Sequence, residues 1–479
     1  MGKLFGSKKS FFAVLTVVIV AGSYIVPAPE GLTPKAWHLL AIYLSAIFGL
    51  VLKPYSEPVI LLGALGASAL LLNNTKDVLG GYASTTTWLV FAAFALSAAF
   101  VSTGLGRRIA YLLIGKMGNT TLGLGYVTAF LDLIISPVTP SNTARAGGIV
   151  FPIMNSVAVA LGSEPGESAR KAGSFLMVNT YMVTKITSFM FLTAMAPNVL
   201  AGDYMYKILG VSLDWMIWFT ALFIPGLILL LIVPFICYVL TKPELKHVDN
   251  KAIASKGLEE LGPMSVREKS LVVLFVLALV GWITPAVCQQ FWGIKVPIDA
   301  TGVAIGIMAA VFLLKVITWE DMLKNKGGWS TFVWYGGIIG LSSVLSKLKF
   351  FDWLAKVMET NMSFGDNAMT ALWIIVFASV AIRYLFASGS AYVVAMLPVF
   401  LTVGKVAGAP PMALALALAA SNSYGGALTH YGGAAAPIIF GAGYNDTKSW
   451  WTVGGVVTLF CFLFMMTVGI LWWKIMGFI

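Results

Sequence analysis

Long apolar stretches recur from one end of this chain to the other, with short polar connections between them. Most are about 18 residues or longer, the length at which an α-helix crosses a bilayer. The period-two alternation typical of a membrane β-barrel is missing. The pattern therefore predicts an all-α polytopic membrane protein in the lipid bilayer. The stretches that qualify with few internal charges are 11–28, 36–52, 57–73, 88–103, 214–240, 270–288, 298–317 and 451–473.

Two short polar sequences interrupt apolar segments, one in each half of the chain. The first is Ser136-Pro137-Val138-Thr139-Pro140-Ser141-Asn142-Thr143, and the second is Ala387-Ser388-Gly389-Ser390. Hydroxyl and amide groups in hydrocarbon are costly unless they line a cavity or bind a ligand. Each interruption lies between two arms of roughly 15 residues, too short to cross a bilayer alone. We therefore expect two re-entrant hairpins, over about 122–161 and about 367–406.

A second irregular segment follows each hairpin. Both segments begin with Asn, a hydroxyl residue and Tyr, at Asn179 and Asn422, and both end at an Ala-Pro pair, at Pro197 and Pro437. Such sequences favour a helix that unwinds midway, with the prolines as hinges, and exposes its backbone groups to a ligand. Kinks that serve packing alone are the alternative. Matched breaks in both halves favour transport.

The longest polar stretch divides the chain nearly in half. We interpret it as a cytoplasmic linker over 242–269, between a first membrane repeat at 1–241 and a second at 270–479. With the hairpins dipping in and out, about 11 full spans remain, and an odd number inverts the second repeat. Inverted repeats with paired interruptions are typical of secondary transporters that bind substrate near the middle of the membrane.

The net charge of +11 does not indicate a nucleic-acid-binding protein. With the N-terminus inside, most Lys and Arg residues fall on the cytoplasmic side, as the positive-inside rule requires. This predicts a multi-pass protein of the cell inner (plasma) membrane with a cytoplasmic N-terminus. A cleaved signal peptide is the alternative for the first apolar stretch, and many further spans favour a retained helix.

The hairpin tips and the second break supply neutral donors suited to carboxylate oxygens, with helix N-termini behind them. Two facing tips would hold a molecule that has a carboxylate at each end. The side chains that carry this prediction are Ser141, Asn142, Thr143, Ser388, Ser390 and Thr429.

Charged and titratable residues in apolar surroundings need a cavity or a partner. We expect Lys185 and His430 to supply positive charge to an anionic substrate; the alternatives are a snorkelling lysine and a packed, neutral histidine. Arg145 is a possible further counter-charge, or pairs with Asp132 in the facing arm of its hairpin. For Arg383, a side chain that simply reaches the outer surface is as good an explanation as one that faces a cavity or a partner.

The run Pro140-Ser141-Asn142-Thr143-Ala144-Arg145, followed by Gly147-Gly148-Ile149 and Pro152, resembles the first Ser-Asn-Thr signature of the divalent anion:sodium symporter family. With Leu428-Thr429-His430-Tyr431-Gly432-Gly433, it is similar to one subgroup of that family, the citrate:succinate antiporters and plastid 2-oxoglutarate/malate translocators. The resemblance covers essentially the whole chain. The second tip departs from it, since it reads Ser388-Gly389-Ser390 rather than Ser-Asn-Thr.

The resemblance implies a homodimer with a static scaffold and a mobile transport domain that moves like an elevator. It implies that residues 141–143 contact one substrate carboxylate and that 388–390, including Gly389, contact the other. In sodium-coupled members the tips border two sodium sites, and Lys185 and His430 would border those sites here. Fixed cations repel sodium, so we expect sodium-independent exchange of dicarboxylates such as 2-oxoglutarate, malate or succinate.

Three other classes of protein are weighed against this antiporter. A sodium-coupled dicarboxylate symporter has the same fold, and an anion channel also uses basic residues and polar tips. An enzyme is not indicated, because catalytic motifs and paired carboxylates are missing. No cofactor or metal site is expected, since the cysteines lie apart in or beside apolar spans, at Cys237, Cys288 and Cys461. The choice among di- and tricarboxylates stays open.

Overall fold

Helices make up nearly all of the structure. The computed structural model describes residues 8–361 and 367–479. Within these residues it contains no β-strand, and ten helices are long and apolar enough to cross a bilayer. The prediction of an all-α polytopic membrane protein is confirmed. Residues 1–7 of the predicted first repeat lie outside the described part of the chain.

The first half of the chain ends in a hairpin, a broken helix and a long final helix. Its helices are α1 (Lys8–Ile25), α2 (Pro34–Leu52), α3 (Glu57–Leu72), α4 (Thr75–Leu79), α5 (Thr85–Thr103), α6 (Leu105–Met117), α7 (Thr121–Ile135), α8 (Phe151–Ala160), α9 (Gly173–Met190), α10 (Ala196–Leu209) and α11 (Trp215–Thr241).

The second half repeats this order from α2 onward. A polar segment that contains α12 (Asn250–Leu261) connects the halves. The helices that follow are α13 (Val266–Trp292), α14 (Ala300–Leu313), α15 (Trp319–Lys324), α16 (Lys326–Lys347), α17 (Phe350–Asn361), α18 (Ala368–Ile382), α19 (Gly389–Val406), α20 (Pro411–Tyr424), α21 (Ala436–Phe440), α22 (Thr447–Phe464) and α23 (Ile470–Ile475).

Each hairpin turns where polar residues interrupt the apolar sequence. In the first, α7 passes through a 3-10 turn, Ser136–Val138, and a π-helical segment, Thr143–Val150, leads into α8. In the second, α18 passes through a 3-10 turn, Arg383–Leu385, and α19 begins at Gly389, after the three residues 386–388. The Ser388 hydroxyl caps α19, because it accepts a hydrogen bond from the backbone N–H of Ala391. We call residues 141–143 tip 1 and residues 388–390 tip 2.

Each hairpin is followed by a helix that stops and restarts. Between α9 and α10 the chain is extended at Phe191 and Met195, on either side of a short 3-10 turn. Between α20 and α21 it passes through the 3-10 turn Gly425–Ala427 and further turns. Pro197 and Pro437 lie in the first turn of α10 and α21, where proline fits because no N–H is needed there. We call residues 191–195 break 1 and residues 425–435 break 2.

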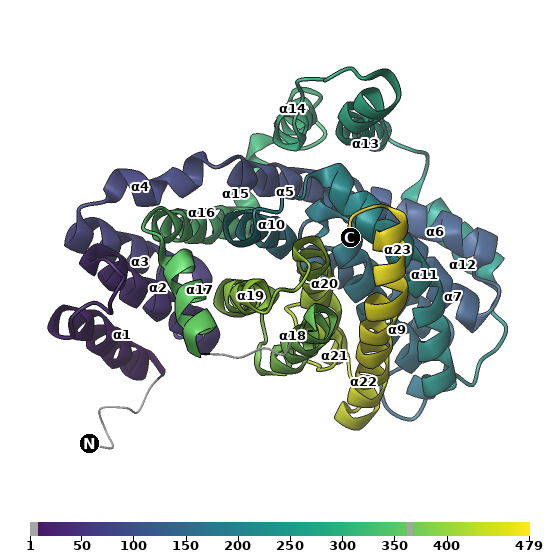
Figure 1. The fold of residues 1–479 in the computed structure, drawn as a ribbon. Coiled ribbons are helices and arrows are strands. Elements are labelled where there is room, and N and C mark those ends of the chain that lie inside the picture. Colours follow the sequence, from purple (N-terminus) through teal and green to yellow (C-terminus); the bar gives the residue numbers. More distant parts are fainter. Residues whose placement is uncertain (1–7, 362–366) are drawn as a thin grey trace.

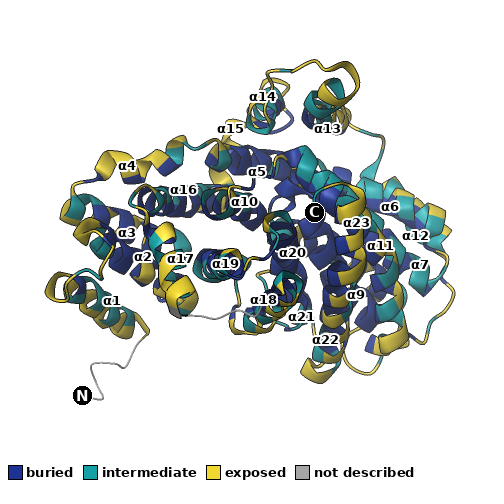
Figure 2. Ribbon diagram, in the orientation of Figure 1, coloured by how far each residue is buried: buried dark blue, intermediate teal, exposed yellow. Residues whose placement is uncertain are grey.

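The elements with breaks and tips lie at the centre of the molecule. Figure 1 shows α10, α19 and α20 between a group that contains α2, α3 and α16 and a group that contains α9, α11 and α22. Every residue of α9 is buried, and Figure 2 shows it in dark blue. By contrast, only 6% of α1 and 22% of the most apolar 18-residue stretch of α13 are buried, so their apolar faces suit contact with lipid.

Candidate functional site

Both tips and both breaks line one central cavity. Its volume is about 180 Å³, on the order of ten times what one water molecule requires. The cavity therefore has room for a small organic anion. Its lining residues from tips, breaks and the adjoining helix ends are Pro140, Ser141, Asn142, Thr143, Met195, Ala196, Pro197, Ser388, Gly389, Ser390, Asn422, Ser423, Gly433, Ala434 and Ala435.

Two buried cations and one wall of other helices complete the cavity. The cations are Lys185 of α9 and Arg383, which follows α18. The wall comes from helices that carry neither a tip nor a break, and it consists of Glu57, Phe94, Thr331 and Trp334. The cavity thus lies between the tip-bearing elements and the α3, α5 and α16 helices.

Lys185 enters the cavity from the middle of α9, and only 4% of it is exposed. Its Nζ lies 4.8 Å from the centroid of the Tyr181 ring, a distance at which a cation is attracted to the ring face. A methyl group in place of a Gly433 hydrogen would lie 2.8 Å from Nζ. The backbone of break 2 can therefore lie this close to the Lys185 amine only because residue 433 is a glycine, which has no side chain.

Arg383 is also buried beside break 2, with 2% of it exposed. Its Nη1 donates to the Phe386 carbonyl at 2.6 Å and its Nη2 to the Gly432 carbonyl at 2.8 Å. The suggestion that Arg383 reaches the outer surface is therefore wrong. None of the ion pairs in the described part of the chain includes Arg383 or Lys185. The positive charges of these two side chains are thus not offset by an ion pair in that part of the chain.

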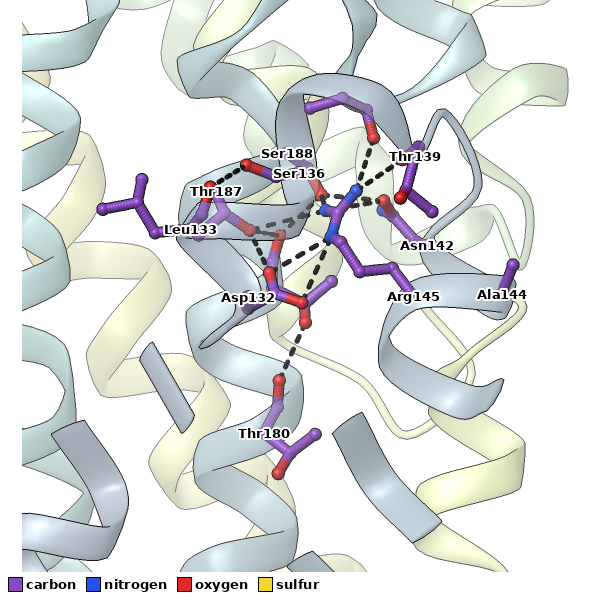
Figure 3. A network of polar contacts seen from close by, with 12 residues as sticks. Asp132, Leu133, Ser136, Thr139, Asn142, Ala144, Arg145, Thr180, Thr187 and Ser188 are labelled. Atoms are coloured by element: carbon purple, nitrogen blue, oxygen red, sulfur yellow. Dashed lines mark hydrogen bonds and ion pairs between the residues drawn. The ribbon is translucent and has the colours of Figure 1, made fainter. Parts of the chain in front are cut away.

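Arg145 is a buried cation of a different kind, because its charge is already compensated. Its Nε lies 3.1 Å from Oδ1 of Asp132, and neither side chain is exposed. The predicted pairing with Asp132 across the hairpin is confirmed. Arg145 does not line the cavity, so it is not placed to act as a direct counter-charge. Figure 3 shows its guanidinium beside Asn142 of tip 1, where Nη2 donates to Asn142 Oδ1 at 3.2 Å.

The two arginines make equivalent bridges in the two halves of the chain. Arg145 Nη1 donates to the carbonyls of Thr139, two residues before tip 1, and of Ala194 in break 1, at 2.8 and 2.7 Å. Arg383 donates to the carbonyl of Phe386, two residues before tip 2, and of Gly432 in break 2. Each guanidinium therefore joins a hairpin tip to the neighbouring helix break.

Thr429 and His430, predicted to bind substrate, do not line the cavity. Break 2 turns between Leu428 and Gly433, which directs them away from it. His430 Nδ1 accepts a hydrogen bond from Trp451 Nε1 at 2.9 Å, and its ring lies 4.6 Å from that of Phe440. The alternative of a packed histidine describes this position.

The sequence prediction also missed Glu57, the acidic residue in the cavity wall. It is the first residue of α3, and its Oε1 accepts a hydrogen bond from the Ser388 hydroxyl of tip 2 at 3.4 Å. An acidic residue in the first turn of a helix is common, because its negative charge interacts favourably with the positive end of the helix dipole. That ordinary pattern gave no signal of a position facing tip 2.

Comparison with solved structures supports the fold. The chain is similar to the Neisseria gonorrhoeae protein described in "Structure and Function of Neisseria gonorrhoeae MtrF Illuminates a Class of Antimetabolite Efflux Pumps". The TM-score is 0.57 at 13% identity, over 98% of this chain and 95% of that one. At so low an identity the likeness concerns the fold alone.

Comparison of sequences identifies the family. Residues 7–479 match the family described as "Sodium:sulfate symporter transmembrane region". The Escherichia coli (strain K12) "Inner membrane protein YbhI" is 56% identical, over 98% of each chain. The Bacillus subtilis (strain 168) "Putative malate transporter YflS" is 40% identical over 97% of this chain and 96% of its own. The Escherichia coli (strain K12) "Citrate/succinate antiporter" is 35% identical over 98% and 99%.

These relatives are named as transporters or membrane proteins rather than enzymes, and they match from end to end. The resemblance drawn from the tip motifs is therefore confirmed. The protein is a multi-pass membrane protein, and the family match across almost its whole length shows that it belongs to the sodium:sulfate symporter, or divalent anion:sodium symporter, family of transporters.

Proposed function

We propose that this protein exchanges one dicarboxylate for another across the inner membrane, without sodium. The observation that carries the proposal is the pair of buried cations, Lys185 and Arg383, that line the central cavity without a carboxylate partner. A buried cation left unpaired costs several kcal/mol, on the order of 3–5. A dianionic substrate removes that cost for both. Relatives named as a citrate/succinate antiporter and a putative malate transporter support the substrate class.

The arrangement of donors supports a substrate with a carboxylate at each end. Tip 1 offers the neutral groups of Ser141, Asn142 and Thr143, whereas the two cations gather around break 2. A methyl group on Gly426 would lie 3.0 Å from Lys185 Nζ and 3.1 Å from Arg383 Nη2, so the two heads are near each other. One carboxylate of 2-oxoglutarate, malate or succinate would meet the cations, and the other would meet tip 1.

The two arginine bridges support independence from sodium. Sodium bound beside a helix break needs oxygen ligands such as backbone carbonyls. Here the carbonyls of Thr139 and Ala194 accept from Arg145, and those of Phe386 and Gly432 accept from Arg383. A guanidinium already satisfies these oxygens and repels a second cation. This role was expected of Lys185 and His430, and Arg145 and Arg383 now suit it better.

Exchange follows if the empty site crosses the membrane much more slowly than the loaded one. The proposed movement is that of an elevator within a homodimer, in which the tips and breaks move past the wall formed by α3, α5 and α16. The empty unit would carry two unneutralised cations through hydrocarbon, which is costly. The unit loaded with a dianion would be nearly neutral. A sodium-coupled symporter is the competing function, and the family description favours it.

The test is uptake of labelled 2-oxoglutarate into proteoliposomes. External sodium is replaced by potassium or choline, and half of the vesicles are preloaded with unlabelled dicarboxylate. We expect uptake that requires the internal dicarboxylate and ignores the external cation. Uptake that requires a sodium gradient and ignores the preload would show a symporter instead, and conductance without stimulation by the preload would show a channel.

Replacing Lys185 by alanine should reduce exchange by about 30-fold or more, because losing one partner of a buried charged contact costs about 2 kcal/mol or more. Initial rates of 2-oxoglutarate exchange, at equal amounts of reconstituted protein, measure this effect. Lys356→Ala serves as the control, since it removes an exposed lysine from α17. A Lys185→Ala variant that exchanges at the rate of the control would contradict the role of Lys185.

A further inference from the structure

Glu57 places a carboxylate of the protein itself opposite tip 2. Its Oε1 accepts the Ser388 hydroxyl, and both residues line the central cavity. A serine hydroxyl has a single proton to donate. Its oxygen also accepts from the Ala391 N–H as the cap of α19, so the proton is the group left for a ligand. At present it points to Glu57.

Glu57 belongs to the wall of the cavity rather than to the elements with tips and breaks. It begins α3, which packs against α2, α4 and α16. Figure 1 shows these helices together, on the side of α19 away from α9. The hydrogen bond from Ser388 therefore joins tip 2 to this wall, in addition to the packing of α19 against α2, where the Tyr43 hydroxyl donates to the Val394 carbonyl.

We propose that Glu57 acts as an internal competitor for the substrate carboxylate at tip 2. This inference rests on the proposed function and adds the residue that controls occupancy of tip 2. With the site empty, the Glu57 carboxylate accepts the Ser388 proton. A substrate carboxylate at tip 2 takes over that proton, and it repels Glu57 because the two charges are alike.

Two consequences follow from this competition. First, Glu57 weakens substrate binding, since each carboxylate at tip 2 excludes the other. Second, it holds the empty tip 2 against the α3 wall and lets go when substrate arrives. The tether makes movement of the empty transporter slower still, which strengthens the obligation to exchange. If the only role of Glu57 were a favourable interaction with the helix dipole of α3, it would have neither effect.

Two substitutions separate these consequences. Glu57→Gln keeps a hydrogen-bond acceptor and removes the charge, whereas Glu57→Ala removes both. Binding of 2-oxoglutarate to the purified, full-length protein measures the competition. We expect the Kd of Glu57→Gln for 2-oxoglutarate to be about tenfold lower than that of the wild-type protein. The effect of the tether is measured by the ratio of the exchange rate to the rate of net efflux into substrate-free medium. We expect this ratio to fall at least about fivefold in Glu57→Ala.

The matched control is Glu320→Gln, because Glu320 is also acidic, lies in the first turn of α15 and is exposed. An unchanged Kd in Glu57→Gln, or a higher one, would overturn the competition. An unchanged ratio in Glu57→Ala would overturn the tether. Binding is measured without any transport, so it tests Glu57 even if the wild-type protein proves to require sodium. Failure of the proposed function would appear instead as wild-type uptake that does not respond to internal dicarboxylate.

Discussion

Replacing Arg383 by alanine is expected to reduce exchange at least about 100-fold, more than any other single change in the cavity. Two effects combine in this variant. The substrate loses one of the two cations that offset its charge. In addition, the carbonyls of Phe386 and Gly432 lose their shared donor, so tip 2 is no longer joined to break 2. Exchange of labelled 2-oxoglutarate in sodium-free proteoliposomes measures the loss.

The conservative variant Arg383→Lys distinguishes charge from geometry. An ammonium keeps the positive charge, but it is a compact donor and does not span two carbonyls as the planar guanidinium does. We expect it to recover part of the binding of 2-oxoglutarate and little of the exchange rate. The control Arg170→Ala removes an exposed arginine and should leave both unchanged. Wild-type exchange in Arg383→Ala would contradict the assignment of Arg383 to the site.

The hairpins and breaks were predictable because their signals are local. Proline, serine and glycine within apolar sequence mark the places where a helix cannot continue, and tips 1 and 2 lie at those places. The long helix α16 was not among the predicted spans, because its glycines and hydroxyl residues lower its hydrophobicity. In the structure those glycines allow close packing. Gly340, for example, lies against the Val78 carbonyl, where a Cβ would come within 1.8 Å.

The residues predicted at the two tips line the central cavity, whereas the residues predicted to supply charge do so only in part. The residues of the two tips and Lys185 line one cavity, because the interruptions of both hairpins meet there. The sequence did not predict where three other side chains lie, those of Arg383, Glu57 and His430. Each is a charged or titratable residue at the end of an apolar run, and the sequence does not say which side of the helix end faces the cavity. Only the path of the chain through break 2 and the packing of α3 decide it.

Replacing Asp132 by asparagine is expected to destabilise the protein by about 3–5 kcal/mol, because it leaves the buried charge of Arg145 without its carboxylate. Neither side chain of this pair is exposed, so water cannot replace the lost partner. Thermal unfolding of the purified protein measures the effect as a lower Tm. Asp77→Ala is the matched control. It breaks an ion pair with Lys347 whose side chains are 50% and 68% exposed, and such surface pairs contribute about 1 kcal/mol at most.

The double variant Asp132→Asn/Arg145→Met distinguishes a role of the ion pair in stability from a role in transport. Removing both charges leaves no unpaired ion, so the Tm should recover part of the loss. Exchange should not recover, because the carbonyls of Thr139 and Ala194 no longer share a donor that joins tip 1 to break 1. Recovery of both Tm and exchange would mean that the pair serves stability alone. A loss of exchange that persists at a recovered Tm would show instead that transport requires the bridge by which Arg145 joins tip 1 to break 1.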